Sequence, residues 1–180
     1  MDIAVLIKYV PDTTAKISIS GNRVDESSVS KWSISPFDEY ALEAALGMKE
    51  SSGAKVTAIT CGPARSEKGL RDAAAVGADA LAHIVVEDLI SLDSTKIQGL
   101  LANAVREIGA NVVFCGKQAA DTNSGSTGPG VAELIGAACV TNASEISNDG
   151  DVFSVLRPAS SGSERVNVSA PCVFAFDKTS

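Results

Sequence analysis

The chain has little of what metal and acid–base chemistry usually require. His83 is the only histidine in 180 residues. It lies in the strand-like segment "LAHIVVE", where a satisfied histidine in a core or at a sheet edge is a simpler interpretation than a general base. The four cysteines lie far apart and form no C-x-x-C pair, so no zinc site or redox pair is indicated. They fit buried free thiols in a reducing cytoplasm.

Clusters of basic residues and long apolar runs are missing too. The formal net charge is -7 with a pI near 4.7, so nothing is expected to neutralise a nucleic-acid backbone. The N-terminal "MDIAVLIKYVPD" is too short to span a membrane and lacks the basic start of a signal peptide. We therefore expect a cytoplasmic protein with no membrane insertion and no nucleic-acid partner.

What the chain does contain is enough apolar material for one core. Hydrophobic residues make up 45% of it, which favours a single domain over residues 1–180. Apolar runs typical of buried strands occur at residues 3–10, 55–60, 81–87, 111–115 and 171–176. Helical patterns lie at residues 35–50, 66–78, 94–110 and 128–138. This alternation predicts an α/β fold, an open and mostly parallel sheet with helices on both faces.

The ends of the helices carry their own signals. Ser35 is a natural N-cap, Pro36 follows at the first helical position, and Asp38 stands where a capping box places its acid. Gly77 and Gly109 each fall where a helix must stop before the next strand. A capping role is therefore the stronger interpretation of Asp38.

Two segments break the alternation of strand and helix. Residues 16–27 alternate about Gly21-Asn22, and residues 151–169 alternate about Ser160 to Ser163. Both predict β-hairpin insertions that decorate the sheet.

The segment "CGKQAADTNSGSTGPG", residues 115–130, is the most informative loop. It follows a predicted strand, precedes a helix, and carries glycines at 116, 125, 128 and 130. Glycines let backbone N–H groups approach an anion, and a helix N-terminus favours phosphate. The spacing matches neither a Walker A loop nor G-x-G-x-x-G. Phosphate binding and a flexible surface loop both remain open from composition alone.

Outside this loop, a few acids and aromatic residues could also contact a ligand. Asp12, Asp38 and Asp121 each lie near a loop at the carboxyl end of a strand and could hold a ribose hydroxyl or Mg²⁺. Trp32 and Tyr40 could pack on a ring, although core packing is the simpler interpretation. No catalytic group emerges, and a redox role would need a bound cofactor.

Five motifs occur in the order and spacing of one family: "VLIKYVPDT", "ISPFDEYALEAAL", "AITCGPA", "LRDAAAVGADAL" and "CGKQAADTNSGSTGPGVAELIG". From residue 1 to about residue 177 the chain resembles the β (small) subunit of electron transfer flavoproteins. The resemblance implies a Rossmann-like, adenine-nucleotide α-hydrolase-like domain. Such a subunit performs no bond-breaking reaction. It binds AMP, or a second FAD in bifurcating members, and pairs with an α subunit with which it shares a redox-active FAD.

The resemblance also implies the residues of the nucleotide site. Leu6 would lie beneath the adenine, the start of the helix would border base and ribose, and Cys61 would make a further contact. Asp121 would hold the acidic position of the phosphate loop, and Ser126 and Thr127 would donate to the phosphates. The implied cofactor-binding residues are Leu6, Ser35, Pro36, Phe37, Asp38, Cys61, Gly116, Lys117, Gln118, Ala119, Ala120, Asp121, Thr122, Asn123, Ser124, Gly125, Ser126 and Thr127.

Partners follow from the same resemblance. An α subunit, dehydrogenases, and a quinone reductase or ferredoxin would exchange electrons through the complex. The chain departs from the family at Ser35, where asparagine is common, and at 122–124, where the family is more acidic. It also stops at "PCVFAFDKTS", where family members continue into an arm that embraces the α subunit. We expect this arm to be lacking and a homodimer to form when the chain is alone.

Two other functions are compatible with the same residues. The chain could be a stand-alone adenine-nucleotide-binding or sensor module without electron transfer, which a missing arm would favour. An ATP-cleaving enzyme of a related fold is the weakest alternative, because the sequence has no P-loop and no evident base.

Overall fold

The centre of the molecule is a six-stranded sheet in which every pairing is parallel. The computed structural model describes residues 1–178. The strand order is β7 (Ala80–Val85), β6 (Lys55–Gly62), β1 (Asp2–Leu6), β8 (Val112–Gly116), β13 (Cys172–Phe176) and β9 (Ala138–Ala143). The predicted open parallel sheet is therefore confirmed.

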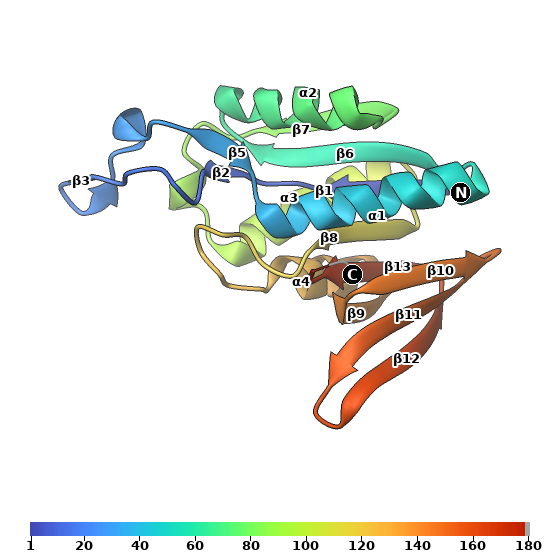
Figure 1. Ribbon diagram of the computed structural model, residues 1–180. Coiled ribbons are helices and arrows are strands. Elements are labelled where there is room, and N and C mark those ends of the chain that lie inside the picture. The colour runs from blue at the N-terminus through green and yellow to red at the C-terminus, as the bar shows by residue number, and fades with distance from the viewer. Residues whose placement is uncertain (179–180) are drawn as a thin grey trace.

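Helices cover both faces of this sheet. The helices are α1 (Pro36–Ser52), α2 (Glu67–Val76), α3 (Ser94–Glu107) and α4 (Thr127–Ile135). Buried residues of α1 and α2 pack on one face, and those of α3 and α4 pack on the other. Figure 1 shows α1 running in front of the sheet, with α3 and α4 behind it. Three short 3-10 helices, η1 (Glu26–Ser28), η2 (Ala64–Ser66) and η3 (Leu89–Ser91), lie in the connections.

Both predicted hairpins are present. Strands β3 (Ile19–Ser20) and β4 (Arg23–Val24) form the first, and β11 (Val152–Ala159) and β12 (Gly162–Ser169) form the second. The second hairpin gains a third strand, β10 (Glu145–Asp149), and this small antiparallel sheet extends from the side of the domain near β13 (Figure 1). Phe153 and Val155 of β11 are fully buried in the core on the α1 side.

Two predicted elements were wrong in extent. The apolar run 3–10 is not one strand: β1 stops at Leu6, and β2 (Tyr9–Pro11) pairs instead with β5 (Trp32–Ile34) in a separate antiparallel sheet. The helix expected over 128–138 ends at Ile135, because Gly136 takes a left-handed conformation with φ 68°. Residues 138–143 then form β9, which the sequence analysis missed.

The helix boundaries were predicted more successfully. Pro36 opens α1. Gly77 and Gly109 have φ of 126° and 71°, conformations that glycine adopts at little cost, so both end their helices as expected. The expectation of four buried thiols was wrong at one position, since Cys139 on the edge strand β9 is exposed.

The order of the strands places one crossing point in the sheet. From β1 the chain moves outward on one side to β6 and β7, then returns to place β8 on the other side of β1. A crevice therefore opens between the ends of β1 and β8, the position at which open α/β sheets bind ligands. Among residues 1–178, no helix is long and apolar enough to cross a membrane.

Candidate functional site

A cleft of about 550 Å³ lies beyond the carboxyl ends of the central strands. Its floor is formed by Leu6, Cys61 and Cys115, which stand near the ends of β1, β6 and β8. The volume falls within the range of small-molecule and cofactor sites, roughly 300–1,000 Å³. The cleft therefore has the size and the place in the fold that a nucleotide site requires.

Most of the residues that the resemblance implied meet in this cleft. Those that line it are Leu6, Asp38, Cys61, Lys117, Gln118, Ala119, Asp121, Thr122, Ser124, Gly125 and Thr127. Those not among its lining residues are Ser35, Pro36, Phe37, Gly116, Ala120, Asn123 and Ser126. The structure thus brings most of the implied residues from the strand ends and the loop together in one cleft. Of the implied residues at the start of α1, only Asp38 lines it. Nucleotide contact itself stays a prediction for all of them.

The loop between β8 and α4 forms one wall. It folds on itself through a hydrogen bond from the Asn123 backbone N–H to the Ala119 carbonyl, 2.8 Å, and another from the Gln118 amide to the Asn123 side chain, 3.1 Å. Asn123 and Gly125 both take positive φ, 53° and 65°. These turns direct the loop into the N-terminus of α4, whose first N–H groups have no acceptor within the helix. The wall therefore ends in backbone donors suited to an anion.

Asp38 does not cap α1, which corrects its predicted role. The Ser35 N–H donates to the Lys8 carbonyl, 2.9 Å, instead of to Asp38. The Asp38 carboxylate accepts two backbone hydrogen bonds, from the N–H of Lys8 and of Gly116, both 2.8 Å. Ser35 also caps nothing with its side chain, since its Oγ accepts from the N–H of Ala120 at 3.1 Å. Both side chains face the sheet and tie α1 to the ends of β1 and β8.

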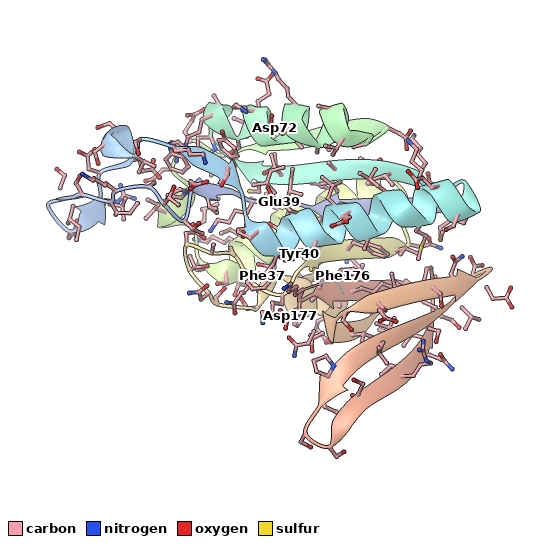
Figure 2. The ribbon with its side chains drawn as sticks, in the orientation of Figure 1. Phe37, Glu39, Tyr40, Asp72, Phe176 and Asp177 are labelled. Carbon is pink, nitrogen blue, oxygen red and sulfur yellow. The ribbon has the colours of Figure 1, made fainter. Side chains whose placement is uncertain are left out.

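Each cation that lines the cleft is paired with an acid of the described chain. Lys8 pairs with Asp121 at 2.8 Å, so two residues of the cleft itself form an ion pair. Figure 2 shows Asp177 next to Phe176 and near Phe37. Lys117 pairs with Asp177 and also lies over the Phe37 ring. The other pairs are Arg23–Asp88 and Arg65–Glu26, both 2.8 Å, and the Lys117–Asp177 distance is 2.9 Å. An anionic ligand would therefore rely mainly on backbone donors or on an exchange of ion-pair partners.

The Lys8–Asp121 pair should contribute little to stability. The two side chains are 27% and 30% exposed, and exposed ion pairs usually stabilise a protein by less than about 1 kcal/mol. We expect Asp121→Asn to change the free energy of unfolding in urea by no more than that amount. A loss of several kcal/mol would show that the pair holds the loop in place.

The wall opposite the loop was not predicted. It includes Tyr9 and Trp32, whose rings stack 6.3 Å apart, and Arg65, whose guanidinium lies 4.0 Å from the Trp32 ring centre. The back of the cleft is apolar, with Leu89, Leu92, Ile97 and Leu101 from η3, α3 and the segment between them. Trp32 was considered from the sequence as a residue that could pack on a ring, but nothing in the sequence placed it beside Tyr9 and Arg65 at one cleft.

The remaining candidate groups have other roles. Asp12 accepts hydrogen bonds from the Thr14 hydroxyl and N–H, 2.6 and 3.0 Å, which hold the pKa of its carboxyl well below the usual range. His83 makes a 3.0 Å contact between Nε2 and the Gly62 carbonyl. Burial raises the pKa of the Cys61 and Cys115 thiols. Within residues 1–178 no group of three His, Cys, Asp or Glu side chains is placed to hold a metal ion.

Comparisons with known proteins agree with the motifs. Residues 24–180 match the family model of the electron transfer flavoprotein domain. The chain is 32% identical over 180 residues to the acryloyl-CoA reductase electron transfer subunit gamma of Anaerotignum propionicum, covering 96% of this chain and 66% of the relative. It is 32% identical over 172 residues to the electron transfer flavoprotein subunit beta of Bacillus subtilis, covering 95% and 66%.

A further β subunit, from Thermoanaerobacterium thermosaccharolyticum, is 34% identical over 179 residues, covering 99% of this chain and 68% of the relative. The chain thus spans about two thirds of the length of the curated relatives it matches. A family match over residues 24–180 and this level of identity show kinship over nearly the whole chain. The chain belongs to the electron transfer flavoprotein family, among relatives of its β subunits.

Proposed function

We propose that this chain binds an adenine nucleotide in the cleft and acts as the β-type subunit of an electron transfer flavoprotein. The observation that carries the proposal is the position of the cleft. It opens at the point where the strand order reverses, and the glycine-rich loop 116–127 leads from it into the N-terminus of α4. That arrangement favours a phosphorylated ligand on physical grounds, whichever family the chain belongs to.

The residues present fit an adenylate group. Leu6, Leu92 and Ile97 offer apolar surface on which a flat base can lie. Ser124, Gly125 and Thr127 line the side where the loop meets α4, and there the first N–H groups of the helix can receive phosphate. The ligand is AMP or the adenylate half of an FAD, since either presents a base and a phosphate to this cleft.

Electron transfer depends on a flavin that the chain would hold together with an α subunit. The flavin supplies the one- and two-electron chemistry when it is bound, and residues of this chain bind and orient nucleotides. Donor and acceptor proteins, dehydrogenases and a quinone reductase or ferredoxin, would reach the flavin through that complex. A subunit of this kind needs no general base.

The proposal predicts stabilisation by nucleotide. A ligand that binds only the native state at about a hundred times its dissociation constant stabilises by about 2.7 kcal/mol. For a domain of this size we expect the melting temperature to rise by several degrees with AMP or FAD. Differential scanning fluorimetry, together with mass spectrometry of ligand released from the native protein, checks this.

The control is a nucleotide that lacks the adenine, such as uridine monophosphate, at the same concentration. A protein that carries no adenine nucleotide when purified and shows no rise with AMP, ADP or FAD would contradict the proposal. Co-expression with a flavin-bearing α subunit tests the second half, since the two chains should purify together with bound FAD.

A further inference from the structure

The crevice between β1 and β8 contains an acidic side chain that reaches in from α1. Asp38 lies in the first turn of that helix, is 6% exposed, and lines the cleft. Its Oδ2 accepts the Lys8 N–H just after β1, and its Oδ1 accepts the Gly116 N–H at the end of β8. One carboxylate therefore spans the point where the strand order reverses.

The fit around this carboxylate is close. A Cβ built on Gly116 would lie 2.5 Å from Asp38 Oδ1 and 2.7 Å from the carbonyl carbon of Phe37. Only glycine lets β8 approach the first turn of α1 at this distance. The adjacent Ser35 Oγ accepts the Ala120 N–H, so the same turn of α1 also fixes the base of the loop that walls the cleft.

Burying the Asp38 carboxylate in the crevice lowers the stability of the folded protein, because the charged form loses its hydration. Burial raises the pKa of Asp38 to about 7, although the two backbone N–H groups and the positive charge of Lys8 act in the opposite direction. The charged or titratable groups around it are Lys8 on the segment after β1, Asp121 and Lys117 on the loop after β8, and Cys115 on β8. A buried apolar side chain of similar size would avoid the loss of hydration. The two strand ends nevertheless meet at a carboxylate.

We propose that Asp38 is a positioning residue: its two carboxylate oxygens hold the N–H groups of Lys8 and Gly116 on either side of the crevice and so fix the shape in which the cleft receives an adenine nucleotide. The inference rests on the proposed function, because it concerns the same site. It assigns Asp38 to the geometry of the floor rather than to a contact with the base or ribose.

The test is Asp38→Asn, compared with wild type by calorimetric titration with AMP and with FAD. An amide offers one acceptor oxygen and turns its NH₂ toward the second N–H, so one strand end loses its partner. We expect the dissociation constant to rise about tenfold, equivalent to about 1.4 kcal/mol. Thermal stability at pH 8 should stay the same or rise, because the buried charge is gone. A merely structural residue would lower affinity and stability together.

The pH profile separates this role from simple repulsion between Asp38 and the ligand. As the pH falls through about 7, the value to which burial raises the pKa of Asp38, one oxygen becomes a hydroxyl and the hold on the two N–H groups weakens. The ratio of the Asp38→Asn to the wild-type dissociation constant cancels the titration of the ligand phosphate. That ratio should shrink toward one at low pH. A ratio that grows as the pH falls would mean that the neutral acid is the competent form and would overturn the proposal.

Two further variants complete the test. Asp121→Asn is the matched control: it also removes an acid of the cleft, but an exposed one, and the pH dependence of binding through neutrality should survive in it. Asp38→Ser, which is smaller and cannot overpack the crevice, should weaken binding as Asp38→Asn does. If both Asp38 variants bind AMP and FAD as tightly as wild type, the positioning role is wrong while the proposed function stands. If wild type binds neither ligand at any pH, the proposed function fails and the positioning role with it.

Discussion

Replacing Gly116 by alanine should destabilise the protein by about 1–3 kcal/mol, the usual range for overpacking a tight interior. The new methyl group would lie 2.5 Å from Asp38 Oδ1 and 2.7 Å from the Phe37 carbonyl carbon. Because one of these atoms belongs to the backbone of α1, no side-chain rotation removes the clash, and the first turn of the helix or the end of β8 must move. Urea unfolding measures the loss.

The same substitution should also weaken nucleotide binding, since the displaced segment carries the loop that walls the cleft. Gly47→Ala is the matched control: Gly47 is exposed in the interior of α1, and an added Cβ meets nothing within 4 Å. There, alanine should stabilise the helix by roughly 0.5–1 kcal/mol and leave binding unchanged. Equal stability of Gly116→Ala and wild type would mean that α1 and β8 are not held in this close contact.

The parallel sheet could be predicted because its signals are local. Continuous apolar runs mark strands buried on both faces, and residues such as Pro36, Gly77 and Gly109 mark helix boundaries whatever the surrounding fold. Strand β9 was missed because its sequence continues the apolar pattern of α4, and only Gly136 and Ala137 lie between the two elements. A single glycine is a weak signal when the periodicity on both sides is apolar.

The role of Asp38 could not be predicted because its partners are distant in sequence. An acid three residues after a serine at a helix start has a local interpretation, the capping box, which needs no tertiary structure. The actual donors, Lys8 and Gly116, lie 30 and 78 residues away. They meet Asp38 only after β1 and β8 have paired and α1 has packed across them.

The two walls of the candidate site also differ in how far the sequence could predict them. The loop 116–127 is distinguished by its glycines and by its place between a strand and a helix, which left phosphate binding and a flexible loop both open. The family resemblance was needed to predict it as a wall of a nucleotide site. The opposite wall depends on how the β3–β4 hairpin, Trp32 and Arg65 fold back over the strand ends. Its residue types are also typical of an ordinary core, and no pattern in the sequence distinguishes the two uses.

The second large effect is a fall in stability between acid and neutral pH that depends on Asp38. Its pKa is about 7 in the folded protein and 3.8 in the ordinary exposed state, so between these values the folded chain binds a proton that the unfolded chain has released. Stability therefore falls as the pH rises from about 4 to about 7 and levels off above it. Between pH 5 and pH 8 the contribution of this one group is about 3 kcal/mol.

Glu39, Asp12 and Asp79 do not reverse this trend in the same window. Burial also raises the pKa of Glu39, so its contribution has the same sign. The carboxyls of Asp12 and Asp79 have lowered pKa values, and the stability they supply is lost only as the pH falls below about 4. We expect urea unfolding of wild type to show higher stability at pH 5 than at pH 8, and Asp38→Asn to lose most of that difference.

The difference in unfolding free energy between wild type and Asp38→Asn should change with pH. At pH 5 the wild-type side chain is a neutral acid inside the crevice, so Asp38→Asn should be close to it in stability or slightly below. At pH 8 wild type bears the full cost of a buried carboxylate, and the amide should be the more stable of the two. A constant difference between them across this range would show that Asp38 is ionised with an ordinary pKa, which would require the crevice to be hydrated rather than closed by α1.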